Sequence, residues 1–312
     1  MILTGHIKLI LLPNKPNKLN HRKTLYIFEN IDMSKCIIIV TLLILIGCTK
    51  TALVEENTDI HDPYRIMNTI PEDLQIAVAK AEMFGAEIYM QDIAAWVVTD
   101  FLSDNGVLGR DKRLRGWVTE HADKEMTSGR MIVTFVGDIE GEFKGLYQVA
   151  TQSGRVLEKT YQAHLEGFEL TPSQLFMFKA RQTALKSEFK PCADKYNTAV
   201  IKFNDEENNY NIVYLLAGSV KHGEVMAGGN YRLIINESGE EILENTPLSK
   251  SCIVLQKTEG VAALTLSHIV EPTPNAVHVF LSLLHQVPIY ILTTENKITW
   301  KVDGNKISII KI

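Results

Sequence analysis

The chain has 312 residues, of which 46% are hydrophobic and 22% are charged, so it has enough apolar material for a folded core. Its formal net charge is −5, and no dense cluster of Lys and Arg occurs along it, which argues against nucleic acid as a partner. The length suits one large domain or two small ones.

The first 32 residues are rich in Asn, Lys, Ile and Leu and show no clear period. A signal peptide normally begins a few residues before its apolar run, and Met33 stands at that position. We therefore expect translation to begin at Met33 and residues 1–32 to be a misread upstream extension. The alternative is an unusually long leader, for which the Lys and Arg residues of this stretch have the right sign.

An apolar run of 12 residues, Cys36–Gly47, follows Lys35. A membrane span needs about 20 apolar residues, so the run fits the core of a signal peptide, residues 33–47, better than a transmembrane anchor. It ends in Leu45-Ile46-Gly47-Cys48, which resembles the lipobox of bacterial lipoprotein signal peptides. The resemblance implies cleavage before Cys48 and a diacylglycerol lipid with acyl chains such as palmitate on that cysteine.

This resemblance also implies a location in the cell envelope, held to the membrane by the lipid. Thr49 is not the Asp that usually signals retention in the inner membrane, so in a Gram-negative cell we expect the outer membrane, facing the periplasm. Without residues 1–47 the chain keeps 26 basic and 35 acidic side chains, a net charge near −9. That charge argues against attachment through a polybasic surface.

Cys192 and Cys252 remain once the signal peptide is removed and Cys48 is lipidated. In an oxidising compartment the simplest expectation is a disulfide between them, which would constrain the unfolded chain by roughly 4 kcal/mol. Two buried free thiols are the alternative, because spacing alone does not fix geometry. Neither cysteine has a second cysteine three residues away, so we expect no cysteine metal site.

Residues 48–70 are polar and predict a tether between the lipid and the folded body. Pro71-Glu72-Asp73 predicts the start of a helix, because proline suits the first turn and acids complement the helix dipole. The helical pattern continues to about Ser103 and is apolar on most faces, which predicts a helix inside a domain. Gly85 within it marks a close crossing or a kink.

After Gly109 the apolar residues recur with a period of two, interrupted by a second helix from Thr171 to about Phe189. We expect an α+β fold with a long buried N-terminal helix packed on a mainly antiparallel sheet, the second helix between two strand groups, and meander connections rather than crossovers. Residues 71–312 are expected to form one globular domain, with a subdivision near Cys192 as the alternative. The predicted strands are Trp117–His121, Met131–Val136, Phe143–Thr151, Ala199–Phe203, Asn211–Leu216, Tyr231–Asn236, Ile253–Gln256, Ala262–Ile269, Val277–Leu283, Ile289–Thr293, Ile298–Val302 and Ile307–Ile310.

The densest mixture of polar and apolar residues lies in Ser267–His285. Its two prolines predict a fixed turn between two strands, across which His268 and His278 face each other. With Glu271 as a third group, this loop has the residue types that hold a metal or move a proton. The spacing matches no known motif, so we favour half-buried structural histidines and expect no metal and no cofactor. The segment resembles envelope proteins of uncharacterised function, which implies no activity.

Asp92 and Asp100 are eight residues apart, about 12 Å along a helix, which exceeds the roughly 5–9.5 Å between paired glycosidase carboxylates. We expect them to cap loops or to bond Arg113 or Arg115. The motifs of serine hydrolases, zinc proteases and nucleotide-binding loops are absent from the sequence. We therefore expect a non-catalytic module that binds another envelope protein, peptidoglycan or an incoming toxin. The alternative is an envelope hydrolase or metal-dependent enzyme that uses the His268/His278 loop.

Overall fold

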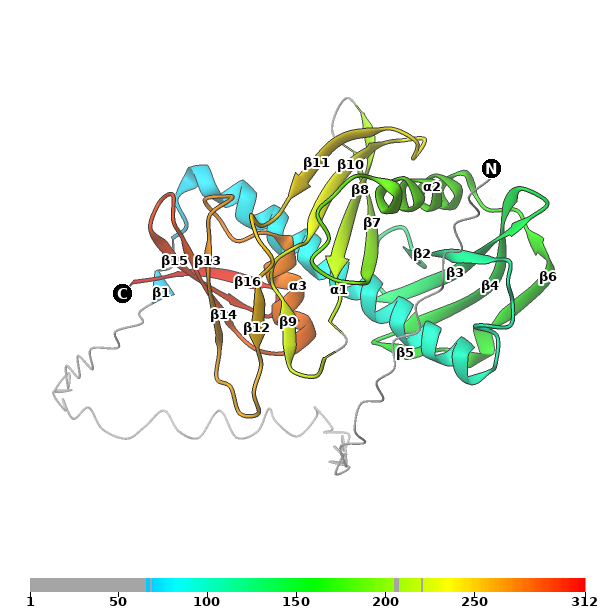
Figure 1. The fold of residues 1–312 in the computed structure, drawn as a ribbon, viewed down its shortest axis with the longest axis horizontal. Helices are drawn as coiled ribbons and strands as arrows, with labels where there is room; N and C mark the ends of the chain where they lie inside the picture. The colour runs from blue at the N-terminus through cyan, green and yellow to red at the C-terminus, as the bar shows by residue number, and fades with distance from the viewer. Residues whose placement is uncertain (1–65, 68, 205–207, 220, 312) are drawn as a thin grey trace, which may run out of the picture. The chain divides into compact units, whose positions relative to one another are not determined.

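The structure, a computed structural model, describes residues 66–67, 69–204, 208–219 and 221–311 (Figure 1). The predicted upstream extension, the signal peptide, Cys48 and most of the tether lie outside these residues. Among the helices of the described residues, none combines the length and the apolar character that a membrane span needs. The described residues combine three α-helices with mainly antiparallel sheets, so the predicted α+β class is confirmed.

Helix α1 (Glu72–Asp104) runs through two hydrophobic cores. Its first half contributes Phe84 and Ile88 to one core, and its second half contributes Val98 and Leu102 to the other. In Figure 1 it accordingly extends from the sheet that contains β13–β16 to the sheet that contains β2–β6. A helix that packs different faces against different cores needs apolar residues around most of its circumference, which explains its sequence.

The sheet beside the second half of α1 is antiparallel throughout. Glu140 and Gly141 have positive φ angles of 53° and 92°, as the two central residues of a tight hairpin turn require. Phe135 and Leu146 face α1 in the core. The elements are β2 (Leu114–His121), β3 (Arg130–Ile139), β4 (Glu142–Gln152), β5 (Arg155–Val156), the 3₁₀ turn η2 (Glu158–Thr160) and β6 (Gln162–Phe168).

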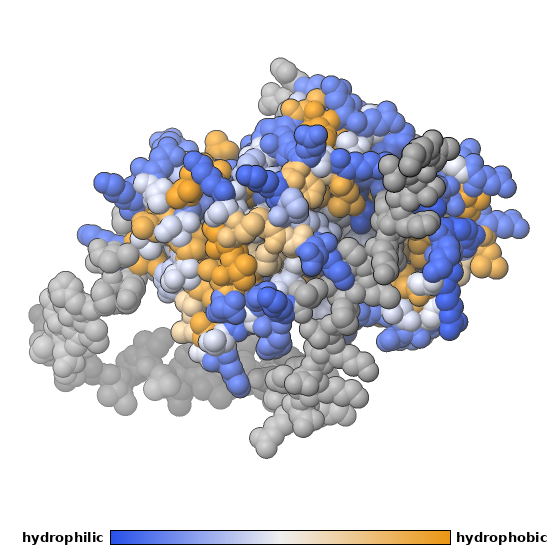
Figure 2. Space-filling view, in the orientation of Figure 1, coloured by the Kyte–Doolittle hydropathy of each residue, from blue (hydrophilic) through white to orange (hydrophobic). Residues whose placement is uncertain are grey.

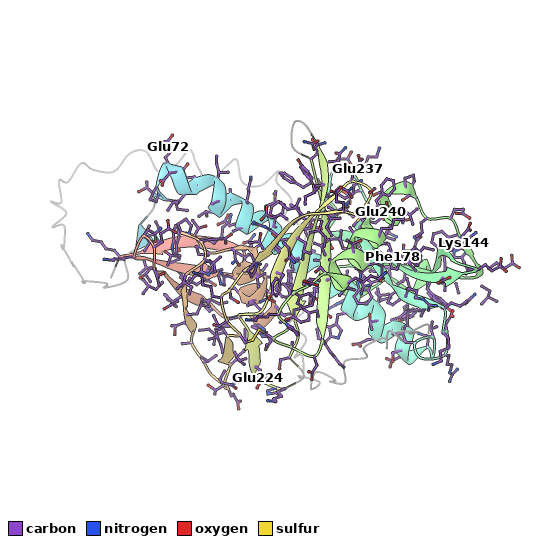
Figure 3. The ribbon with its side chains drawn as sticks, turned by 45° about the horizontal axis from the view of Figure 1, so that its top comes forward. Glu72, Lys144, Phe178, Glu224, Glu237 and Glu240 are labelled. Carbon is purple, nitrogen blue, oxygen red and sulfur yellow. A yellow bond between two sulfur atoms is a disulfide. The ribbon has the colours of Figure 1, made fainter. Side chains whose placement is uncertain are left out.

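Helix α2 (Pro172–Lys186) begins after Thr171, where the sequence predicts a helix start, and its first turn is closed by a reciprocal cap between Thr171 and Gln174. It packs Phe178, labelled in Figure 3, on a second antiparallel sheet, in the order β11-β10-β8-β7. Lys179 binds Glu240 of the β10–β11 turn at 2.7 Å, which fixes the helix to that hairpin. The strands are β7 (Tyr196–Asn204), β8 (Asn209–Ala217), β10 (Tyr231–Asn236) and β11 (Ile242–Pro247); β9 (Glu224–Met226) pairs separately with β12 (Val254–Gln256).

The outer edge of β7 is closed by side chains of α1. Gln91 donates from Nε2 to the Val200 carbonyl at 2.9 Å and accepts from the Val200 amide at 3.0 Å through Oε1. Asp92 accepts from Asn197 at 3.1 Å. Gln91 therefore satisfies backbone groups that an edge strand otherwise leaves unpaired.

The C-terminal sheet has the order β1-β16-β15-β14-β13 and contains one parallel pair, β13–β14, joined through helix α3. The predicted strand Val277–Leu283 is wrong, because this segment lies within α3. The predicted absence of crossovers is wrong here too, since parallel strands need such a connection. The elements are β1 (Ile66–Met67), β13 (Leu264–His268), α3 (Ala276–His285), β14 (Ile289–Thr293), β15 (Ile298–Asp303) and β16 (Lys306–Ile310).

Gly85 lies where α1 crosses α3. A Cβ atom at Gly85 would stand 2.4 Å from Cβ of Val279 and 2.7 Å from the Ala276 carbonyl oxygen. Glycine is therefore required for the two helices to approach, and the predicted close crossing is confirmed. Strand β1 lies within the segment predicted as a tether, because Ile66–Met67 extends the sheet by pairing with β16.

Cys192 and Cys252 form a disulfide with a Cα–Cα distance of 5.4 Å, so the predicted bond is present and the thiols are not free. The bond joins the segment before β7 to the segment before β12. The Tyr196 hydroxyl accepts from the Cys192 amide and donates to the Gly229 carbonyl, both at 2.9 Å. A Cβ at Gly229 would lie 2.3 Å from Cβ of Cys192, so a side chain there would push the bridge away.

Candidate functional site

The structure brings His268, Glu271 and His278 into one neighbourhood. His268 ends β13, Glu271 lies in the following loop and His278 lies in the first turn of α3. The two histidines are 3% and 2% exposed, and their ring centroids are 4.9 Å apart in an edge-on arrangement. They face each other between a strand and a helix, not across a turn between two strands.

His278 takes part in the cap of α3. Its Nδ1 accepts from the Asn275 amide at 3.0 Å, and Asn275 Oδ1 accepts from the Val277 amide at 3.1 Å. Burial, together with the charge of His268, lowers the pKa of His278 well below its ordinary value. His278 is therefore neutral near pH 7, and the lone pair on Nδ1 is already used for structure.

Glu271 stands between His268 and Arg232 of β10. Its Oε2 is 3.8 Å from His268 Nε2, and its Oε1 is 3.9 Å from Arg232 Nη1. At these separations the groups interact by charge rather than by a hydrogen bond. Burial favours a raised pKa for Glu271, but His268 and Arg232 outweigh it and hold the pKa below its ordinary value. The ionised carboxylate thus ties the loop after β13 to β10.

Three buried nitrogens near this loop have no hydrogen-bond partner within the described residues: Arg232 Nε, His268 Nε2 and Asn275 Nδ2. Two of them belong to residues, Arg232 and His268, whose charges act on Glu271. The arrangement is one carboxylate among several donors, which suits a charge cluster that holds a loop. It does not supply the set of lone-pair donors that a transition metal requires.

The part of the chain that the structure describes contains no group of three or more His, Cys, Asp or Glu side chains able to hold a metal ion. His268, Glu271 and His278 are neighbours, but they do not form such a ligand set. A hollow lined by Asn209, Tyr210 and Asn236 includes none of these three residues.

A histidine–carboxylate pair that the sequence did not reveal links α1 to the end of β2. His121 Nε2 lies 2.7 Å from Glu87 Oε2, and Gln91 donates to the other oxygen of Glu87 at 2.8 Å. The bond to Glu87 raises the pKa of His121, although burial opposes the shift. No hydroxyl or thiol among the described residues bonds to this imidazole. The pair therefore lacks a nucleophile and serves to join helix and sheet.

Asp92 and Asp100 do not bond the arginines expected from the sequence. Arg113 binds Asp111 at 2.6 Å, and Arg115 lies 3.9 Å from Asp138. Desolvation raises the pKa of Asp92 to about 6, against the opposing effect of its bond from Asn197. The expected bonds to Arg113 or Arg115 are wrong, because Asp92 faces the edge of β7 and both arginines have nearer partners.

Comparisons with known proteins return no relative: no protein-family model matches the chain, and no curated protein or solved structure matches it either.

Proposed function

We propose that this chain is a lipid-anchored protein of the bacterial cell envelope and that its folded body is a non-catalytic binding module. The observation that carries the proposal is the lipobox-like Leu45–Cys48, which follows Lys35 and an apolar run too short to span a membrane. A diacylglycerol on Cys48 would supply two acyl chains, and stable anchoring takes about two such signals.

The disulfide supports an envelope location, because structural disulfides persist in oxidising compartments. Thr49 supports sorting to the outer membrane if the cell is Gram-negative. In this proposal the tether separates the body from the lipid, and α1 is the framework on which the sheets and α3 are arranged.

The structural roles of the buried polar residues support a binding function rather than catalysis. His278 caps a helix, Glu271 holds a loop to β10, and Glu87 joins α1 to His121. Each group has a structural partner, and none is poised beside a nucleophile. A partner such as another envelope protein or peptidoglycan would then bind to the surface of the body.

Fatty-acid labelling in cells tests the anchor. We expect the full chain to incorporate a labelled fatty acid and to enter the detergent phase of a cloud-point extraction. Cys48→Ala should remove the label and leave an uncleaved precursor, whereas the control Cys36→Ala should keep both label and cleavage. Label that persists in Cys48→Ala, or is absent from the unaltered chain, would contradict the proposal.

The structural role of His278 is tested separately. His278→Gln retains an acceptor at the third helical position and should preserve the fold, while His278→Ala should lower the free energy of unfolding by about 1–2 kcal/mol. Elemental analysis of the purified chain should show no stoichiometric zinc. Zinc that disappears in a His268→Ala, His278→Ala double variant would favour a metal-dependent enzyme instead.

A further inference from the structure

The outer edge of β13 is open. The Leu264 amide donates to the Pro288 carbonyl at 2.9 Å, and the Thr294 amide donates to the His268 carbonyl at 3.0 Å. In a parallel pair, alternate residues direct both backbone groups to the same neighbour. The N–H and C=O groups of the intervening residues, Thr265 and Ser267, therefore point away from β14.

Within the described residues, the outward backbone groups of Thr265 and Ser267 make no backbone hydrogen bond. No second strand there pairs with β13, and Thr265 and Ser267 are both exposed. Beside them on the same face of the sheet, Ile269 is 50% exposed and Leu292 is 41% exposed. Figure 2 shows an apolar surface in the region where Figure 1 draws β13 and β12.

The sequence of this edge lacks the usual features that prevent strand pairing. Residues 261–270 contain no Asp, Glu, Lys, Arg or Pro, whereas exposed edges commonly carry charges, prolines or bulges. Three other edges carry such protection. Gln91 caps β7, Glu244 and Pro247 lie on β11, and Gln182 donates to the backbone of Arg115 on β2.

We propose that β13 pairs antiparallel with β13 of a second copy of this chain. The proposal goes beyond lipid anchoring and identifies one partner of the body. Pairing centred on Leu266 sets Thr265 opposite Ser267 of the second copy, with their outward backbone groups bonded to each other. Two five-stranded sheets then become one continuous sheet.

A second copy fits this edge because two identical copies of it do not repel each other. The outward-facing residues of β13, Thr265 and Ser267, carry no charge, and His268 is buried, so two copies of the strand meet without the repulsion that like charges create across a strand pair. The neighbouring apolar Ile269 is carried by both copies and extends the contact. Confinement of both copies to one membrane surface would raise their effective concentration and favour a pairing of modest affinity.

Sedimentation equilibrium of the full chain in mild detergent, over a concentration series, tests the proposal. We expect the protein mass to rise from one chain to two. Ser267→Pro removes an outward N–H and leaves the bonds to β14 in place, so it should raise the dissociation constant of the dimer by at least about tenfold. The matched control Ser267→Val keeps the N–H and should dimerise like the unaltered chain.

A monomer at every concentration, or a Ser267→Pro variant that dimerises as well as the unaltered chain, would overturn the proposal. Circular dichroism establishes that each variant is folded. If Ser267→Pro fails to fold, Thr265→Lys replaces it, since it keeps the N–H and sets like charges at the pairing edge. Fatty-acid labelling is scored independently, so the anchor and the dimer can fail separately.

Discussion

The edges of β7 and β13 show two different outcomes for the same structural problem. The backbone at the edge of β7 is satisfied by Gln91, which lies 109 residues before Val200 in the sequence. The edge of β13 has no such partner in the described part of the chain, and its outward-facing residues, Thr265 and Ser267, carry no charge. An unpaired strand edge is a template for another strand, so the edge of β7 is closed within the chain and the edge of β13 is the one that we propose pairs with a second copy.

The difference arises from the position of α1. Asp92 and Gln91 follow each other on the helix and reach two different residues of β7. The polar residues Gln91 and Asp92 occur in a largely apolar helix because they form hydrogen bonds to the edge strand β7. Substitutions can separate the contribution of the closed β7 edge to stability from the association that we propose for the open β13 edge.

Removal of the disulfide should have the largest effect on stability. Cys192→Ala with Cys252→Ala should lower the free energy of unfolding by about 2–5 kcal/mol, because the bond closes a long loop in the unfolded chain. Urea unfolding of this double variant beside the unaltered chain measures the loss. An unchanged midpoint would show that the loops before β7 and β12 are held by other contacts, such as those of Tyr196.

Opening the edge of β7 should have the next largest effect. Gln91→Leu leaves the buried amide and carbonyl of Val200 without partners, which should cost about 2–4 kcal/mol. Gln75→Leu is the matched control, since Gln75 is exposed on the same helix and bonds only the Ile70 carbonyl. Equal urea midpoints for the two variants would contradict the role given to Gln91.

The pKa of Asp92 predicts a pH dependence at the same edge. A folded-state pKa of about 6, above the ordinary 3.8, means that folding favours the protonated acid. The contribution of protonated Asp92 to the free energy of unfolding is fully present below the unfolded pKa. It is lost as the pH rises through about 6, above which the buried carboxylate destabilises the fold.

Asp92→Asn keeps an acceptor for Asn197 and removes the titration. It should raise the free energy of unfolding at neutral pH by about 1–2 kcal/mol, less than the full shift would give because the side chain retains some exposure. The gain should shrink toward acidic pH in urea titrations. A gain that grows as the pH falls would have the wrong sign for this account.

A substitution at the open edge of β13 should have the smallest effect on stability and the largest effect on association. Thr265→Lys changes an exposed side chain and should shift the free energy of unfolding by less than about 0.5 kcal/mol. It should nevertheless abolish the dimer in sedimentation, because the two lysines lie along the pairing edge. A large loss of stability would show that the edge is packed within its own chain.

The sequence predicted α1 and α2 to within a few residues because their starts carry local signals, Pro71 for α1 and Thr171-Pro172 for α2. Helix α3 was missed because Val277 and Val279 alternate with a polar residue as in a strand, while the cap at Asn275 depends on His278. The Glu87–His121 pair and the closure of β7 by Gln91 could not be predicted. They join residues far apart in the chain, and no local pattern encodes that proximity.

Amide hydrogen exchange at single residues tests the contrast between the two edges most directly. The full chain in detergent is compared at low and high protein concentration. We predict that the Val200 amide is protected at both concentrations, whereas the amides of Thr265 and Ser267 become protected only at the high one. Fast exchange at Thr265 and Ser267 under both conditions, or fast exchange at Val200, would contradict the account.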